Sequence, residues 1–411
     1  MSTIMAVNSG SSSLKFRLFK MPGEEVIADG QVERIGLSDS AYKITIHGKT
    51  LRRECKAPNH TAAAQIMLES LARHSGSLHA LEIDGVGHRI VHGGELFDHS
   101  VLVDDQAIKQ IRSLEGLAPL HNPANLAGIR ACIKALPGVP QAAVFDTAFH
   151  QSMSEATYLY GLPYQFYQKY AVRKYGFHGL SHQYVTHRAA ELLHQPIKQL
   201  KLISCHLGNG ASVDAVQGGR SVDTSMGFTP LSGLTMGTRT GDVDPAVIPY
   251  LMNQTGLTPE ELIALFNKRS GLLGITGTSN DVRDILKQQQ RGSRRAGLAI
   301  DVFVDRVKKY IGAYTLKMQG VDAIIFTAGI GENCAEIRER ILSGMGFMGL
   351  MLDPERNRTI KSEGFITAQN SKIKALVIPT NEEIVIARET LHLINQWKTE
   401  HQETSDRAER M

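Results

Sequence analysis

The chain has 411 residues, of which 42% are hydrophobic and 21% charged, so we expect a globular protein with two or three domains. Its 45 basic and 41 acidic residues give a formal net charge of +4. This excess is too small and too evenly spread to indicate a nucleic acid or an anionic membrane as a partner. The four cysteines are far apart with no C-x-x-C pair, which favours reduced thiols in the cytoplasm over a zinc site or a disulfide framework. No secretory signal or membrane-spanning run is recognisable.

The first half of the chain alternates strand and helix patterns. Residues 5–20 predict a strand, a polar loop and a second strand, and the β pattern continues through 25–36 and 41–50. Further elements follow in the order helix 60–76, strand 83–94 with a glycine-rich end, helix 123–136 and buried strand 141–150. This alternation indicates an α/β fold.

A second half begins near residues 158–175 and repeats the alternation. The predicted elements are helix 180–196, strand–loop–strand 201–219, helices 244–256, 258–271 and 295–320, strand 321–333, and a last strand and helix within 375–398. Thr258 followed by Glu261 is the capping-box pattern for a helix start. The charged tail 399–411 is expected to be frayed.

Two segments resemble each other. AVNSGSSSLKFRLF (6–19) and SCHLGNGASVDAVQ (204–217) each place a short strand before asparagine, glycine and serine and then a second strand. The similarity suggests an internal duplication, with two similar sheets that each present a polar hairpin.

The two hairpins are candidate phosphate-binding loops. Backbone N–H groups and serine hydroxyls between Asn8 and Lys15 can surround phosphate oxygens, and the glycines on both sides of Asn209 permit a similar approach. The alternative for each segment is an ordinary polar turn. The Walker A pattern is absent, so a phosphate loop of that type is excluded.

Two arginines lie in places where a charge needs an explanation. Arg89 interrupts the buried strand GHRIVHGG, and Arg239 lies in the glycine-rich segment GTRTGDVDP. A single buried arginine is most often a structural ion-pair partner. Two guanidinium groups are what a reaction between two anions requires, because they neutralise repulsion and bind carboxylate or phosphoryl oxygens with a planar fork.

Carboxylates and a histidine complete the set of candidate site residues. Asp146 and Glu382 follow buried strands, and the carboxyl ends of strands in α/β folds commonly face ligands. Mg²⁺ prefers one or two carboxylates together with phosphate and water, which this pair can supply. His178 lies in YGFHG, where the alternative is a structural histidine. FTAGIGEN (326–333) ends a strand with glycines that would admit a nucleotide base, or forms a tight strand-to-helix turn.

Eight segments together resemble the acetate kinase family over about residues 7–388. They are VNSGSSSLKF, HRIVHGG, FDTAFH, YGFHG, HLGNGAS, DTSMGFTPLSGLTMGTRTGDVDP, FTAGIGEN and IPTNEE. The resemblance implies two duplicated actin-like (ribonuclease H-like) α/β domains around a nucleotide cleft. We expect residues 1–150 with 384–411 to form the first domain, and residues 151–383 to form a nucleotide-binding and dimerisation domain. The family typically forms homodimers through this second domain.

The resemblance also implies a role for each matching residue. ATP or ADP would contact Asn8, Ser11, Ser13, Lys15, His206, Gly208, Asn209, Gly210, Asp281, Arg283, Gly329, Ile330, Gly331 and Asn333. The catalytic positions would be Arg89, Asp146, His178, Arg239 and Glu382. Mg²⁺, with Mn²⁺ as an alternative, would be held by Asn8 and Glu382. The substrate pocket would contain Arg89, Val91, Leu120, His121, Phe177 and Pro230.

The implied reaction is the reversible, direct in-line transfer of the ATP γ-phosphoryl group to acetate, giving acetyl phosphate and ADP. A propionate kinase with the same chemistry is the alternative, since one methylene changes discrimination by only about 1–3 kcal/mol. Val91 would keep the pocket narrow and favours acetate, whereas alanine at this position would suit propionate. A non-catalytic ATP-binding switch, like the actin and chaperone relatives, would keep the hairpins but would not need both arginines and a small apolar pocket.

Overall fold

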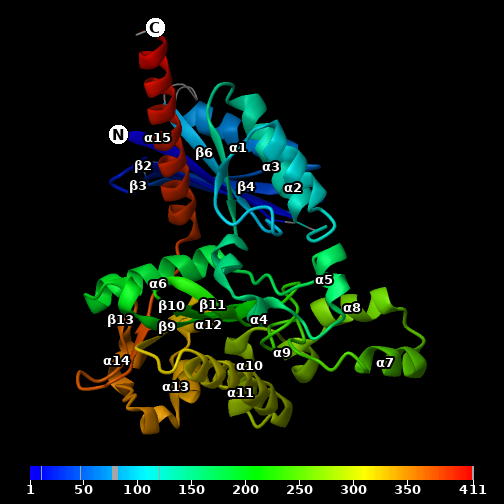
Figure 1. Cartoon of the computed structure of the whole chain (residues 1–411). Coiled ribbons are helices and arrows are strands. Elements are labelled where there is room, and N and C mark those ends of the chain that lie inside the picture. The colour runs from blue at the N-terminus through cyan, green and yellow to red at the C-terminus, as the bar shows by residue number, and fades with distance from the viewer. Residues whose placement is uncertain (11, 47, 76–81, 120, 410–411) are drawn as a thin grey trace. The chain divides into compact units, whose positions relative to one another are not determined.

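The computed structural model describes residues 1–10, 12–46, 48–75, 82–119 and 121–409. The chain divides into unit 1, Met1–Ala148 with Asn381–Met411, and unit 2, Phe149–Thr380. Each unit is built around one β-sheet (Figure 1). Among the described residues, no helix is both long enough and apolar enough to cross a bilayer. Two predicted site residues, Ser11 and Leu120, lie outside the described residues.

The sheet of unit 1 has the strand order β5-β4-β3-β2-β1-β6-β8-β7. Its strands are β1 (Ser2–Ser9), β2 (Ser13–Met21), β3 (Glu25–Glu33), β4 (Ala41–Ile46), β5 (Lys49–Glu54), β6 (Ile83–Ile90), β7 (Val101–Leu102) and β8 (Gln141–Phe145). The first five strands form an antiparallel meander, and β6 and β8 then continue the sheet parallel to β1. The carboxyl ends of β1, β6 and β8 therefore lie at the same edge.

Helices cover both faces of this sheet (Figure 1). α1 (His60–Ser75) and α3 (Asn122–Ala135) pack together on one face, with α2 (Asp105–Ser113) beside α3, and α15 (Glu382–Glu409) packs on the strands from the other side. The approach of α15 explains the small residues of β6. A Cβ atom added to Gly87 would lie 2.1 Å from Oγ1 of Thr390 and 2.5 Å from Cγ2 of Ile386, so only glycine fits beneath the helix.

The sheet of unit 2 has the order β11-β10-β9-β12-β14-β13. Its strands are β9 (Lys201–Leu207), β10 (Ala211–Gln217), β11 (Arg220–Thr224), β12 (Ala323–Thr327), β13 (Gly364–Phe365) and β14 (Lys374–Val377). β9, β10 and β11 are antiparallel neighbours, and β12 and β14 continue parallel to β9. The core β3-β2-β1-β6-β8 of unit 1 has the same order and directions as β11-β10-β9-β12-β14. The internal duplication suggested by the two hairpin sequences is thus present in the fold.

The helices of unit 2 surround this sheet. They are α4 (Glu155–Tyr158), α5 (Tyr164–Tyr170), α6 (Gly179–Leu193), α7 (Val247–Thr255), α8 (Pro259–Lys268), α9 (Gly271–Thr276), α10 (Val282–Gln290), α11 (Arg294–Lys317), α12 (Ala328–Asn333), α13 (Ala335–Leu342) and α14 (Pro354–Thr359). Short 3₁₀ segments are η2 (Ala148–Ser152), η3 (Ile197–Gln199) and η4 (Met345–Met348). Apolar residues of α6, including Val185 and Ala189, are fully buried in one core with the strands. α11 contacts β9 and β10.

One expectation about the chain's end is wrong. The segment 399–411 was expected to be frayed, but α15 continues through it to Glu409. Glutamate, glutamine, alanine and arginine all have high helix propensity, and no glycine or proline interrupts them. A helix already held on the sheet of unit 1 can therefore extend through this polar segment.

Candidate functional site

Three predicted site residues of unit 1 lie side by side across its sheet. Asn8 near the end of β1 is in register with Lys15 on β2 and with Arg89 on β6. Asp146 follows β8 directly, and Glu382 is the first residue of α15. The parallel strands thus bring together residues that are far apart in the sequence, as the sequence pattern predicted for the carboxyl ends of strands.

Arg89 is the centre of this group. Its Nη2 donates to Oδ2 of Asp146 at 2.9 Å, its Nη1 lies 3.5 Å from Oδ1 of Asn8, and its Nε lies 3.7 Å from Oε2 of Glu382. Burial lowers the pKa of Arg89, but Asp146 and Glu382 raise it by more, so it stays charged. The buried Nε–H has no hydrogen-bond partner among the described residues. Arg89 is thus an ion-pair partner with one hydrogen-bond donor, Nε–H, that is unused and lies near the carboxylate of Glu382.

The fit of Mg²⁺ to unit 1 can be judged from its oxygen donors. Asn8 Oδ1 and the carboxylate of Glu382 are hard oxygen ligands near Arg89, and Asp146 supplies another carboxylate. Burial raises the pKa of Glu382, opposed mainly by Arg89, so a cation would stabilise its ionised form. Within the described residues, no cluster of three or more acidic, histidine or cysteine side chains could hold an ion alone. These donors fit a magnesium ion that takes its other ligands from phosphate and water.

Two residues that the sequence did not single out support the first hairpin. Asn125 on α3 donates from Nδ2 to the carbonyl of Ser9 at 2.8 Å and accepts from the backbone N–H of Val91 at 3.2 Å. His60 at the start of α1 hydrogen-bonds the carbonyl of Gly10 through Nε2 at 2.6 Å. Asn125 therefore connects the predicted phosphate hairpin to the predicted substrate residue Val91. In the sequence, the only signal was a polar residue, Asn125, within the predicted helix 123–136.

In unit 2, His178 and Arg239 converge on the second hairpin. A Cβ atom added to Gly210 would lie 3.4 Å from Nη1 of Arg239 and 3.5 Å from Nε2 of His178. His178 has a positive φ of 60° at the N-cap of α6 and stacks on the ring of His206 at 4.1 Å between centroids. Phe177 is buried beside it, and its carbonyl is hydrogen-bonded by His150.

Arg239 differs from Arg89 in having no carboxylate neighbour. Its Nη1 donates to the carbonyl of Pro230 at 3.3 Å and contacts Sδ of Met236 at 3.7 Å, and no ion pair is formed with any described residue. Burial lowers the pKa of Arg239, which means that its charge is not compensated by the protein. A half-buried guanidinium of this kind favours the binding of an anion.

A separate cavity of about 500 Å³ lies beside the second hairpin, within the range of small-molecule sites. Its lining includes seven of the predicted nucleotide-binding residues: Gly208, Asn209, Asp281, Arg283, Gly329, Ile330 and Asn333. Asn280, Val282 and Cys334 also line it and were not predicted. The cavity therefore joins the second hairpin, the start of α10 and the strand-to-helix turn of FTAGIGEN.

Local contacts fix the shape of this cavity. Asn209 accepts a hydrogen bond from Nδ2 of Asn280 at 2.8 Å, and a Cβ atom on Gly237 would lie 2.0 Å from Oδ1 of Asn209. Asp281 caps α10 and forms an ion pair with Arg283, which lowers the pKa of Asp281 to about 2. The lining of the cavity thus includes both the ionised Asp281, which accepts hydrogen bonds, and the second hairpin.

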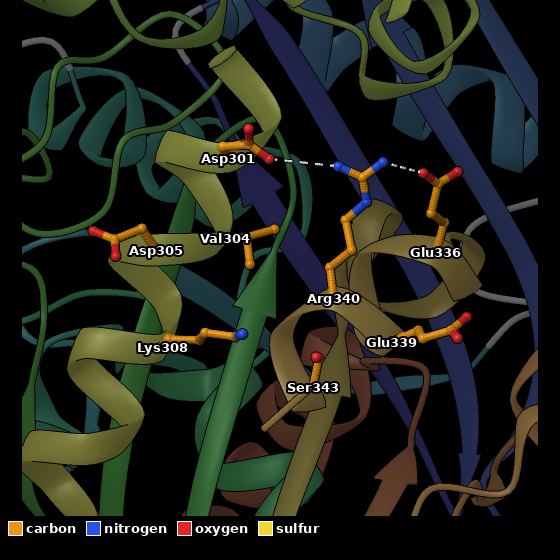
Figure 2. A pocket seen from close by; sticks show the side chains of 8 residues that line it. All are labelled: Asp301, Val304, Asp305, Lys308, Glu336, Glu339, Arg340 and Ser343. Atoms are coloured by element: carbon orange, nitrogen blue, oxygen red, sulfur yellow. Dashed lines mark hydrogen bonds and ion pairs between the residues drawn. The ribbon is translucent and has the colours of Figure 1, made fainter. Parts of the chain in front are cut away.

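A second groove in unit 2 does not fit the predicted ligand. It has a volume of about 720 Å³ between α11 and α13 and contains none of the predicted site residues. Figure 2 shows Arg340 between Asp301 and Glu336, with Asp305, Lys308 and Glu339 nearby. Its four carboxylates outnumber its two basic groups, so the groove would repel phosphate.

Comparisons with known proteins agree with this geometry. The model of the acetokinase family matches residues 3–388. The chain belongs to the acetokinase family. An acetate kinase of Bacillus cytotoxicus is 56% identical over 395 residues, which cover 96% of this chain and all of that protein.

Two solved structures show how broad this similarity is. The crystal structure of Porphyromonas gingivalis acetate kinase matches with a TM-score of 0.91 and 44% identity, covering 96% of this chain and 100% of that one. A propionate kinase of Francisella tularensis matches with a TM-score of 0.89, 41% identity and the same coverage. The actin-like two-domain fold expected from the sequence is therefore confirmed, while similarity to both kinds of kinase leaves the acid to be argued from the site.

Proposed function

We propose that this enzyme transfers the γ-phosphoryl group of ATP to acetate, giving acetyl phosphate and ADP, and that it catalyses the reverse reaction. The observation that carries the proposal is that two side-chain N–H donors lie beside Gly210. Arg239 Nη1 and His178 Nε2 both face this residue, and Arg239 has no carboxylate partner among the described residues. An arginine without a carboxylate partner beside a second N–H donor suits the equatorial oxygens of a phosphoryl group in transfer.

The chemistry requires charge neutralisation and does not need a general base. Acetate is ionised at neutral pH because simple carboxyl groups titrate near 4. Its attack on ATP therefore brings two anions together. Arg89 would hold the carboxylate through its guanidinium, which stays charged, while Arg239 and His178 would stabilise the charge that spreads over the phosphoryl oxygens.

Magnesium would be held in unit 1 by Asn8 and Glu382, with Mn²⁺ as a substitute. When bound, the ion supplies positive charge to the ATP phosphates. Asn8 and Lys15, adjacent across the first hairpin, would orient the phosphate chain, and in unit 2 the cavity of about 500 Å³ would hold adenosine. Asp146 would keep Arg89 in place through its 2.9 Å hydrogen bond.

The choice of acid is argued from Val91 and its neighbours. Val91 is held by Asn125 and is only 8% exposed, so its branched side chain limits the space at the predicted methyl pocket. In unit 1, His121 would also contribute to this pocket. Propionate is the second candidate, because a relative with 41% identity is a propionate kinase. Comparing kcat/KM for acetate, propionate and butyrate decides between them, and a higher value for propionate would overturn the choice of acetate.

The test of the reaction itself is product capture. Acetate, Mg²⁺-ATP and hydroxylamine should give acetyl hydroxamate and ADP in equal amounts. ADP without hydroxamate would indicate an ATPase, and ATP binding without either product would indicate the non-catalytic switch. Because ATP and acetate are both available in the cytoplasm, we place the enzyme there.

We further propose a homodimer through unit 2. α7 has no buried residue although it contains valine, isoleucine, leucine and methionine, and α5 has none either. Tyr250 on α7 and Ile263 on the neighbouring α8 are 63% and 42% exposed. Such an apolar surface favours association with a second copy.

Charged substitutions on and away from this surface test the dimer. Tyr250→Glu combined with Ile263→Glu should give a monomer in sedimentation velocity. Phe347→Glu, which also replaces an exposed aromatic residue in unit 2, should leave the dimer intact. A wild-type monomer at micromolar concentration would contradict the proposal.

A further inference from the structure

A chain of buried hydroxyl and imidazole groups leads to His178 in unit 2. Oγ of Ser204 on β9 lies 2.9 Å from Nδ1 of His182 on α6. Nε2 of His182 lies 2.8 Å from Oγ of Ser212 on β10, and the same oxygen lies 2.8 Å from Nδ1 of His178. Ser204, His182 and Ser212 are all completely buried. Bulk solvent therefore does not reach these three side chains.

Ser212 couples the protonation of the two rings. Its hydroxyl has one proton but contacts a nitrogen of each histidine, so it donates to one ring and accepts from the other. If it donates to Nδ1 of His178, a neutral His178 carries its own proton on Nε2. If it donates to His182 instead, a neutral His178 has its proton on Nδ1, and Nε2 cannot donate.

Ser204 determines which arrangement is adopted. Among the described residues, His182 Nδ1 is the partner for the Ser204 hydroxyl. A buried hydroxyl proton without an acceptor is costly, so Ser204 donates to this nitrogen. Burial, together with His150 and His206, lowers the pKa of His182 well below its ordinary value, so the ring is neutral and has a single proton. That proton must be on Nε2, which donates to Ser212.

We propose that Ser204, His182 and Ser212 form a relay that holds neutral His178 in the tautomer with its proton on Nε2. This nitrogen is the one that faces Gly210 beside Arg239. The inference rests on the proposed function for the ligand that Nε2 meets, a phosphoryl oxygen. The three relay members are positioning residues, since they act through His178 and do not contact the ligand themselves.

The relay has a consequence for pH dependence. With it, His178 donates from Nε2 whether the ring is neutral or charged. Without the Ser212 hydroxyl, neutral His178 can adopt either tautomer, and only the imidazolium always has an Nε2 proton. The groups facing His178 include the stacked ring of His206, His182 behind Ser212, and the guanidinium of Arg239. Loss of Ser212 should therefore make the rate fall as pH rises and the imidazolium of His178 loses its proton.

The experiment compares Ser212→Ala with wild type in the full-length enzyme between pH 6 and 8.5. The variant's kcat should fall by about 10²-fold at pH 8.5, the loss typical of removing one transition-state donor, and by less than about threefold at pH 6. The KM for acetate should stay within about threefold, because the relay does not contact the acid. Ser204→Ala should shift the profile in the same direction with a smaller amplitude.

Thr186→Val is the matched control. Thr186 is also fully buried on α6, but its hydroxyl donates to the carbonyl of His182 at 2.7 Å and not to a ring. The kcat of Thr186→Val should depend on pH as that of wild type does. A Ser212→Ala enzyme with unchanged kcat at pH 8.5 would overturn the relay, whereas unchanged kcat in His178→Ala would overturn the proposed role of His178 itself.

A second measurement does not depend on activity and reads the tautomer in the wild-type protein. Wild-type protein labelled with ¹⁵N-histidine gives distinct nitrogen shifts for the two neutral tautomers. With His178→Gln used to assign the signal, the Nε2–H form should be observed for His178 at pH 8.5. A signal from the Nδ1–H form would overturn the proposal directly.

Discussion

Asn8 and Arg89 face each other across two parallel strands of unit 1, with Oδ1 of Asn8 3.5 Å from Nη1 of Arg89. Asn8 thereby contacts the guanidinium without neutralising it, whereas Asp146 forms an ion pair with it at 2.9 Å. The same side chain that would bind the metal thus lies beside the one that would bind the acid. This proximity connects the two binding events in unit 1.

Arg89→Lys should impair the use of acetate more than the use of ATP. Lysine keeps the charge but replaces the planar fork with one ammonium group, so it cannot bind Asp146 and a carboxylate in the same geometry. Losing one hydrogen bond to a charged group costs about 1.5–3 kcal/mol, so the KM for acetate should rise about tenfold to a hundredfold. The KM for ATP should stay within about threefold in the same assays. An acetate KM equal to wild type would remove Arg89 from the acid site.

Arg239→Ala should lower kcat by at least about 10²-fold, because a guanidinium on the transferred phosphoryl group is worth about 10³–10⁵ in related enzymes. ATP affinity, measured by fluorescence or calorimetry, should change little, since we propose that adenosine is bound in the neighbouring cavity. Arg220→Ala removes an exposed arginine from β11 in the same unit and should leave kcat unchanged. A loss smaller than tenfold in Arg239→Ala would exclude this arginine from the transition state.

Glu382→Gln should increase the Mg²⁺ concentration required for half-maximal rate. The amide keeps the size of the side chain but removes the negative charge, and even the loss of an outer-shell partner typically costs 10–100-fold in metal affinity, so at least about tenfold is expected. Glu383→Gln is the natural control, because this neighbour faces Arg17 at 3.9 Å. Identical Mg²⁺ dependence in the two variants would mean that Glu382 does not organise the metal.

Local sequence signals predicted much of the fold. Thr258 and Glu261 form both hydrogen bonds of the capping box at the start of α8, because that motif depends only on residues within one turn. The two hairpins and the strands around them were also predicted, because the apolar pattern of a strand and the residues of a turn are local features of the sequence. The duplication became certain only from strand order, which arises from contacts between distant segments.

The site could be predicted only in part, because it too is formed by contacts between distant segments. Arg89 and Glu382 are brought within 3.7 Å by the packing of α15 on the sheet, which no local pattern encodes. The motifs identified these residues through family resemblance, but not their ion pairs. The Ser212 contact between His178 and His182 joins α6 to β10 and likewise had no signal in the sequence.

The buried His88 should make the protein sensitive to acid. Burial lowers its pKa to about 4, opposed by the 2.8 Å hydrogen bond to Gln141, whereas an exposed histidine titrates near 6.5. Between these two pKa values, the unfolded chain therefore binds a proton at His88 that the native state does not bind. Stability contributed by this group is complete above about pH 6.5 and is lost as pH falls towards 4, by about 3 kcal/mol in all.

Urea denaturation at pH 7 and pH 4.5 checks this expectation, followed by a signal from unit 1. His88→Gln should lose less free energy of unfolding on acidification than wild type does, although it is less stable at pH 7 because the packing is altered. His99→Gln replaces a histidine whose side chain is 75% exposed and should show the wild-type difference between the two pH values. If His88→Gln and wild type lose equal stability, protonation of His88 does not drive acid unfolding of unit 1, and His92, whose pKa burial also lowers to about 4, becomes the residue to replace.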